Sequence, residues 1–210
     1  GLVGEDGATH HGCYDIAAYR CIPNAVIAVP ADELELKNMM YTASMADGGP
    51  FIIRYPRGCG ENVPWKTAEY ELMPPGHGQR VVEGRDIAVI VAGPSVWRAR
   101  EAIEEFSKEK AWTPSLYNIR YIKPIDEDLL KEACTGHRTI ITIEDGCVAG
   151  GLHGAVSEYA AERFPGVEVL GIGIPDEFVA QASQAEQREY CGLTSGRILR
   201  TLLREAAKIK

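Results

Sequence analysis

The chain has 210 residues, of which 45% are hydrophobic and 25% charged, a composition typical of a globular protein with one or two domains. Its formal net charge of -8 and the lack of a Lys/Arg-rich run argue against nucleic acid or an anionic membrane as the main partner. No apolar stretch approaches the roughly 20 residues that a membrane span requires. The six cysteines are scattered without a C-x-x-C pair, which favours a reduced, cytoplasmic setting.

The first sixty residues are expected to form a strand–helix–strand unit. After a Gly-rich loop, the pattern predicts a strand at 25–29, a helix capped by Asp32 that runs to about 46, and a strand at 51–54. Strands this apolar are typical of a parallel sheet covered on both faces. Two strands cannot bury their own faces, so the segment either packs on the rest of the chain or lacks strands that precede Gly1. We favour the second alternative.

Residues 58–82 are rich in proline and glycine and predict an irregular linker. After it, apolar runs alternate with helical periodicity, which predicts a small three-layer α/β domain over 83–210. The predicted strands are 86–92, 114–119, 139–143 and 167–171. The predicted helices are 95–109, 126–134, 150–164, 185–190 and 195–208.

The N-terminal loop has the composition of an active site. Asp6, Thr9, His10 and His11 place a carboxylate, a hydroxyl and two imidazoles close together, flanked by glycines that let a ligand approach the backbone. Imidazole can transfer a proton near neutral pH, and a carboxylate can orient it or bind substrate hydroxyls. A polar surface turn would have the same composition, and the loop alone does not decide between the two. No metal is expected, because His10, His11 and Cys13 are too few ligands for structural zinc.

Two arginines follow the second predicted strand, in the sequence Arg54-Tyr55-Pro56-Arg57. Ligands of open α/β sheets gather at the carboxyl ends of strands, and a guanidinium group presents a planar fork of donors that suits phosphate or carboxylate. In an extended chain, side chains three residues apart point to opposite faces, so one arginine is expected to reach a given anion. The other is expected to be a structural ion-pair partner.

In the second half, Glu144 and Asp145 precede glycines at 150, 151 and 154. The segment lacks the patterns of phosphate-binding and dinucleotide-binding loops, and its two acidic residues would repel phosphate. We therefore expect the glycines to allow tight packing between strand and helix. His153 is expected to be a packed residue rather than a catalyst.

Taken in order, these motifs carry a family resemblance. The runs DGATHHG, YD, RCIPNAVIAVP, ADELEL, MMYTA and GPFIIRYPRG resemble the pyrimidine-binding domain of 1-deoxy-D-xylulose-5-phosphate synthases, in the transketolase superfamily, and THHG with YD and RYPRG are the most specific parts. The second half resembles the transketolase C-terminal domain through IKPID, TIEDG, GG-x-x-G and GIPDEF. The resemblance assigns 1–60 to the end of the first domain, 61–82 to the linker and 83–210 to the second. Transketolases share the D-G-x-T-H core but continue with Gln-Pro and lack RYPRG.

The resemblance implies condensation of pyruvate with D-glyceraldehyde 3-phosphate to 1-deoxy-D-xylulose 5-phosphate and carbon dioxide, a step toward isoprenoids and thiamine. It implies thiamine diphosphate with magnesium as cofactors of the full-length enzyme, which we expect to be a cytoplasmic homodimer. Asp6 would bind the sugar hydroxyls, His10 would assist proton transfer at the reacting carbonyl, and Arg57 would bind the substrate phosphate. Arg54 is a second candidate for the same phosphate.

In this family the residues that bind magnesium diphosphate and activate the cofactor precede the segment aligned with Gly1. We therefore expect no cofactor-binding or metal-binding residues in this chain, and no activity of the chain alone. One alternative is the C-terminal subunit of a split transketolase. Another is a non-catalytic dimerisation module, because the second domain contains no convincing catalytic set.

Overall fold

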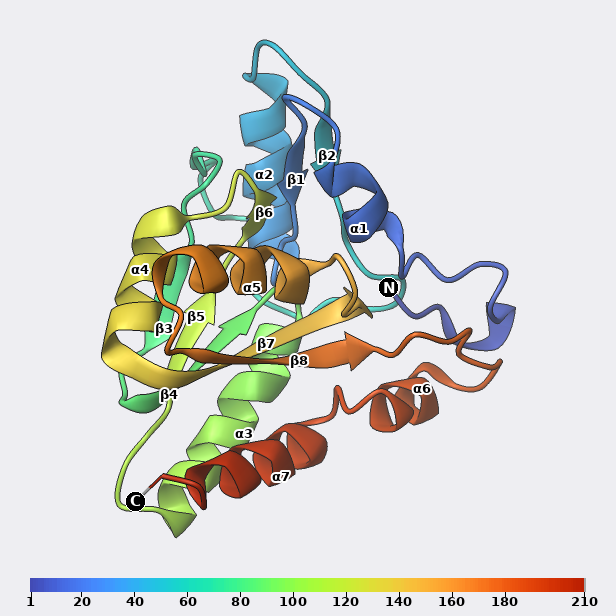
Figure 1. Ribbon diagram of the computed structural model, residues 1–210. Coiled ribbons are helices and arrows are strands. Elements are labelled where there is room, and N and C mark those ends of the chain that lie inside the picture. The colour runs from blue at the N-terminus through green and yellow to red at the C-terminus, as the bar shows by residue number, and fades with distance from the viewer. Residues whose placement is uncertain (210) are drawn as a thin grey trace.

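The larger of two sheets is built by the alternating strands of the second half. In the computed structural model, which describes residues 1–209, its strand order is β3-β5-β4-β7-β8 (Figure 1). The antiparallel pair is β3 with β5, and the other neighbouring strands run parallel. The strands are β3 (Gln79–Val82), β4 (Asp86–Val91), β5 (Ser115–Asn118), β7 (His137–Cys147) and β8 (Glu168–Ile174).

Helices cover both faces of this sheet, because alternate residues of each strand point to opposite sides. In β4, Ile87, Val89 and Val91 pack with residues of α3 (Ser95–Glu109) and α7 (Ser195–Ala206). Ala88 and Ile90 instead pack with residues of α4 (Glu127–Gly136) and α5 (Leu152–Arg163). Figure 1 shows the two helix pairs on opposite sides of the sheet, so the predicted three-layer α/β architecture is confirmed.

The smaller sheet joins the two halves of the sequence. Its order is β2-β1-β6, in which β1 (Val26–Ala28) is parallel to β2 (Phe51–Ile53) and antiparallel to β6 (Tyr121–Lys123). The first segment therefore packs on the rest of the chain through β6. The helix α2 (Glu33–Ser44) lies between β1 and β2 in the sequence. Its N-cap is Asp32, whose side chain accepts from the backbone N–H groups of Leu34 and Glu35, as predicted.

The sequence patterns do not predict several short elements. The patterns miss η1 (Gly4–Asp6), α1 (Asp15–Arg20), β3 and β6. The first two are a single 3-10 turn and a six-residue helix without a side-chain cap, so neither leaves a periodic signal. The expected irregular linker holds as far as residue 78, but β3 is a strand. Its residues are largely exposed because it lies at the edge of the sheet.

A buried polar cluster fixes the junction between the halves. The Glu35 carboxylate accepts from Arg120 Nε at 2.7 Å, from Asn118 Nδ2 at 3.1 Å and from the Ala31 backbone N–H at 2.8 Å. The indole Nε1 of Trp97, on α3, donates to the Ala31 carbonyl. Each partner satisfies a group that would otherwise be buried without a hydrogen bond, so the cluster favours one relative position of the halves.

Within residues 1–209, no helix combines the length and apolar character that crossing a membrane would need.

The last two helices complete the fold on the side of α3. The seven-residue α6 (Gln184–Tyr190) starts with a capping box between Ser183 and Glu186, and α7 follows after a short turn.

Candidate active site

The N-terminal loop and the segment after β2 meet at one point. The carboxylate of Asp6 forms an ion pair with the guanidinium group of Arg57. Both side chains remain accessible to solvent, at 36% and 60% of their full exposure, so a ligand can reach either. The structure thus brings together two of the four predicted site residues, although they are 51 positions apart in the sequence.

The two adjacent histidines have different surroundings. The ring of His10 is exposed, and its Nδ1 lies 3.0 Å from Thr9 Oγ1. The ring of His11 is half-buried: Nδ1 accepts from the Val3 backbone N–H and Nε2 donates to the carbonyl of Val179. His11 is therefore occupied in holding the loop, whereas His10 is free of such contacts among the described residues and can turn toward a ligand.

Arg54 differs from Arg57 in every contact. Its Nε donates to Asp15 at 2.8 Å, and its Nη2 donates to the carbonyls of Gly12 and Asp145. The side chain is only 9% exposed. These acceptors belong to the N-terminal loop, to α1 and to β7, so Arg54 connects these three parts of the chain.

Asp145 anchors the start of the same loop from below. Its side-chain Oδ1 accepts from the Leu2 backbone N–H at 3.1 Å, and its carbonyl accepts from Arg54. The strand β7 extends beyond the predicted 139–143 and carries Asp145 to this position. Neither Asp15 nor Asp145 is singled out as a site residue by sequence patterns, because their role depends on contacts across 39 and 91 positions.

The neighbouring acidic residue, Glu144, is fully buried at the start of α5. Its carboxylate accepts from the backbone N–H groups of Leu152 and His153, at 2.8 and 2.9 Å. A side chain at Gly151 would place its Cβ 2.1 Å from Glu144 Oε2, which confirms that this glycine serves close packing. Since a protein carboxylate already occupies the helix start, an external phosphate has no place there.

Burial raises the pKa of Glu144 to about 7, against the lowering effect of its hydrogen bonds from the N–H groups of Leu152 and His153.

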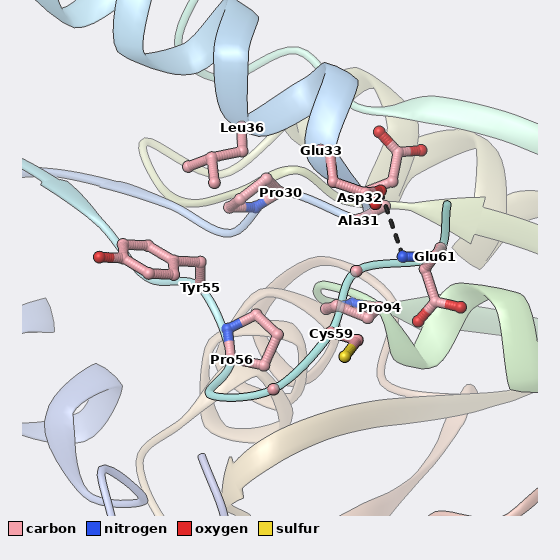
Figure 2. A pocket seen from close by; sticks show the side chains of 12 residues that line it. Pro30, Ala31, Asp32, Glu33, Leu36, Tyr55, Pro56, Cys59, Glu61 and Pro94 are labelled. Atoms are coloured by element: carbon pink, nitrogen blue, oxygen red, sulfur yellow. Dashed lines mark hydrogen bonds between the residues drawn. The ribbon is translucent and has the colours of Figure 1, made fainter. Parts of the chain in front are cut away.

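A pocket of about 210 Å³ lies beside the Arg57 segment (Figure 2). Figure 2 shows Tyr55 and Pro56 on one side of it and Pro30 with Leu36 on the other. The charged groups in its lining are all acidic, and Glu33 accepts from the backbone N–H of Glu61 at 3.2 Å. Since acidic groups disfavour an anion, we do not assign an anion site to this pocket.

Among residues 1–209, no three His, Cys, Asp or Glu side chains form a group that could hold a metal ion. Magnesium bound to a diphosphate needs oxygen ligands, one or two of them carboxylates. Of the acidic groups near Arg57, Asp6 pairs with Arg57 and Glu33 accepts from backbone N–H groups. The Asp6–Arg57 pair is therefore not surrounded by the carboxylates that a magnesium diphosphate needs.

Two family profiles match the chain. The transketolase pyrimidine-binding domain matches residues 1–61, and the transketolase C-terminal domain matches residues 76–198. The chain belongs to the transketolase family.

The relatives in sequence share the name of one kind of enzyme within this family. A 1-deoxy-D-xylulose-5-phosphate synthase of Bacteroides thetaiotaomicron is 45% identical over 98% of this chain and 32% of its own length. The synthase of Thermomicrobium roseum is 39% identical over 92% of this chain and 30% of its own length. The expected resemblance to these synthases is confirmed. The chain spans about a third of the length of these relatives.

Solved structures agree on the fold. A split-gene transketolase, described as an inactive beta4 tetramer, is 26% identical with a TM-score of 0.81, over 94% of this chain and 62% of that chain. The transketolase of Campylobacter jejuni is 17% identical with a TM-score of 0.65, over 96% of this chain and 29% of that chain. At that identity the second comparison shows the fold alone.

Proposed function

We propose that this chain forms part of a 1-deoxy-D-xylulose-5-phosphate synthase and carries the residues that bind the aldehyde substrate. The complete enzyme would condense pyruvate with D-glyceraldehyde 3-phosphate and release carbon dioxide. The observation that supports this most is the meeting of Asp6 and Arg57 at an accessible position. One group suits hydroxyls and the other suits phosphate, and a short sugar phosphate presents both.

Arg57 is proposed to bind the phosphate of the aldehyde. Its guanidinium group offers paired N–H donors to phosphate oxygens, and its exposure leaves them within reach. Asp6 would accept hydrogen bonds from the substrate hydroxyl and hold Arg57 in place before binding. Arg54 stays a candidate for the same phosphate, but its Nε and Nη2 already donate to protein acceptors, so it has less capacity for a ligand.

His10 is proposed to move the proton. In this condensation, carbon 1 of pyruvate leaves as carbon dioxide and carbon 2 bonds to the aldehyde carbon. The aldehyde oxygen then gains negative charge and takes up one proton to become a hydroxyl. An exposed imidazole on the same loop as Asp6 can supply that proton.

Thiamine diphosphate would supply the carbanion chemistry of the complete enzyme. Because the Asp6–Arg57 pair is not surrounded by the carboxylates that a magnesium diphosphate needs, we assign the site residues binding, orientation and proton transfer only. The same reasoning gives the expectation that the 210-residue chain alone is inactive. A homodimer in the cytoplasm is part of this proposal.

The test is an assay of the full-length enzyme that contains this segment. Pyruvate-dependent consumption of D-glyceraldehyde 3-phosphate would be measured with and without thiamine diphosphate and magnesium. Cofactor-dependent formation of 1-deoxy-D-xylulose 5-phosphate is expected. Activity with xylulose 5-phosphate and ribose 5-phosphate alone would instead identify a transketolase and refute the proposal.

A second candidate is supported by the structural comparison. The split-gene transketolase resembles almost the whole of this chain and is described as an inactive beta4 tetramer. The corresponding function here would be that of a C-terminal subunit that needs a partner chain. Transketolase activity on adding a separate N-terminal subunit would support it, and the same assay separates the two candidates.

A further inference from the structure

Three glutamines from the second half hold the loop that carries Asp6. They stand at positions 181, 184 and 187, at the start of α6 and just before it. Figure 1 shows α6 and the segment before it next to the N-terminal loop. In the sequence these residues appear as a glutamine at every third position of QASQAEQ. This spacing alone does not show what the glutamines contact.

Gln184 contacts both parts of the candidate site at once. Its Nε2 donates to the carbonyl of Leu2 at 2.8 Å and to the carbonyl of Arg57 at 3.0 Å. The side-chain amide has two N–H donors, so both are used. One amide group therefore joins the loop of Asp6 to the residue that forms the other half of the ion pair.

The other two glutamines hold the loop between Leu2 and Asp6. Gln187 is 1% exposed; its Oε1 accepts from the Gly4 N–H at 2.9 Å and its Nε2 donates to the Gly4 carbonyl at 3.1 Å. Gln181 Nε2 donates to the carbonyl of Glu5 at 2.6 Å. The two residues preceding Asp6 are thus fixed by hydrogen bonds from the second half.

Glycines allow this close approach. Gly4 has φ +71°, and a Cβ there would lie 3.1 Å from Gln184 Cγ. Gly58 has φ +124°, and a Cβ there would lie 3.4 Å from Gln184 Oε1. Both positions also lie in a region of φ that other residues rarely adopt. Both loops therefore place a glycine against the same glutamine.

We propose that Gln184 is a positioning residue that sets the spacing between Asp6 and Arg57, and thereby the preference for a short phosphorylated aldehyde. This inference rests on the proposed function, because it takes Arg57 as the phosphate ligand. The Gln184 amide donates to two backbone carbonyls, so it acts through the two loops and not on the substrate. The second domain would then contribute to substrate selection.

The experiment compares Gln184→Met with Ser183→Ala in the full-length enzyme. Methionine keeps the length of the side chain and removes both N–H donors. Ser183→Ala removes the capping box of α6 but leaves the Gln184 amide in place. KM and kcat would be measured for pyruvate, for D-glyceraldehyde 3-phosphate and for unphosphorylated glyceraldehyde.

For Gln184→Met we expect the KM for the phosphorylated aldehyde to rise about tenfold, from two lost hydrogen bonds. The KM for pyruvate should change less than about twofold, and the preference for the phosphorylated over the unphosphorylated aldehyde should fall about tenfold. Ser183→Ala should leave these constants within about twofold of the parent values. Equal effects of the two variants, or equal effects on both aldehydes, would reduce Gln184 to a structural role and overturn the proposal.

Hydrogen exchange of the same proteins separates this inference from the proposed function. In Gln184→Met, the amides of Gly4 and Gly7 in one loop and of Arg54 at the start of the Arg57 segment, which all donate hydrogen bonds in the parent, should exchange faster, whatever substrates the enzyme uses. In Ser183→Ala, faster exchange should be confined to α6. The parent enzyme could lack synthase activity while both loops of Gln184→Met exchange faster. In that case the proposed function would fail, and Gln184 would still join the two loops but have no role in substrate selection. Unchanged exchange in either loop of Gln184→Met would refute the inference that Gln184 joins them.

Discussion

Arg54 and Arg57 are three positions apart, yet their energetic roles differ. Arg54 is 9% exposed and donates to acceptors on three elements, whereas Arg57 is 60% exposed and pairs with Asp6 alone. Breaking a buried pair leaves charges and carbonyls unpaired inside the protein, while an exposed pair contributes little to stability. The two residues can therefore be separated experimentally.

Replacing Arg57 should affect substrate binding and spare the fold. In the full-length enzyme, Arg57→Ala should raise the KM for D-glyceraldehyde 3-phosphate by a factor on the order of 30, since charge-assisted hydrogen bonds to phosphate are lost. The free energy of unfolding of the chain should change by less than about 0.5 kcal/mol. Steady-state kinetics and urea unfolding test the two parts. An unchanged KM would exclude Arg57 as the phosphate ligand.

Replacing Arg54 should do the opposite. Arg54→Met should lower the free energy of unfolding by about 3 kcal/mol, because Asp15 and the carbonyls of Gly12 and Asp145 lose their donor. Urea unfolding followed by circular dichroism measures this, with Arg57→Met as the matched control. A loss no larger than that of the control would contradict the structural role.

At the scale of elements, β7 and α5 are joined through one buried carboxylate. Glu144, near the end of β7, accepts hydrogen bonds from the backbone N–H groups of Leu152 and His153 at the start of α5. Its carboxylate therefore takes the place of an external anion. The arrangement is predictable in part: the acidic residues rule out a phosphate loop, and the glycines indicate close packing. That the carboxylate turns inward is not predictable, because this depends on the length of β7 and the path of the chain after it.

The stability of this junction should depend on pH. Burial raises the pKa of Glu144 from 4.5 to about 7 in the folded chain. Between these values the unfolded chain releases a proton that the folded chain keeps, so stability is full below pH 4.5 and falls as pH rises to about 7. The contribution lost is about 3 kcal/mol, from roughly 1.4 kcal/mol for each pH unit.

Urea unfolding at several pH values between 5 and 8 measures this change. Glu144→Gln should remove most of the fall with pH, whatever its effect at a single pH. Glu158→Gln, at an exposed position of α5, should keep the fall. A variant Glu144→Gln with the pH dependence of the parent chain would show that another group is responsible.

At the scale of the whole molecule, the two halves depend on each other. The second half contributes β6 to the small sheet, Arg120 and Asn118 to the Glu35 cluster, and three glutamines to the N-terminal loop. Contacts of this kind join residues 83 to 183 positions apart, so no local pattern predicts them. The repeated α/β elements and the residue types of the site were predictable, because periodicity and motif are local. The joining strand and the bridging glutamines were not.

Loss of the Glu35 cluster should loosen this junction. Arg120→Ala leaves a buried carboxylate without its cation and should lower the free energy of unfolding by about 3 kcal/mol. With Trp65 and Trp112 replaced by Phe, Trp97 fluorescence reports on the junction through its contact with Ala31. In urea its transition should precede that of circular dichroism in Arg120→Ala and coincide with it otherwise.

Arg100→Ala is the matched control for this experiment, because Arg100 lies near the same junction but pairs on the surface with Glu104. It should change the free energy of unfolding by less than about 0.5 kcal/mol. Similar losses from both replacements would mean that the buried pair does not hold the halves together.

The strand β6 also limits how such proteins can recombine. The two family matches end at residue 61 and begin at residue 76, which suggests a natural crossover point for hybrids between relatives. A hybrid made there would pair β1 of one parent with β6 of the other, and would set one parent's loop glycines against the other parent's glutamines. Inheritance of the two halves should therefore be linked, with substitutions at positions 4 and 58 constrained by the residue at position 184.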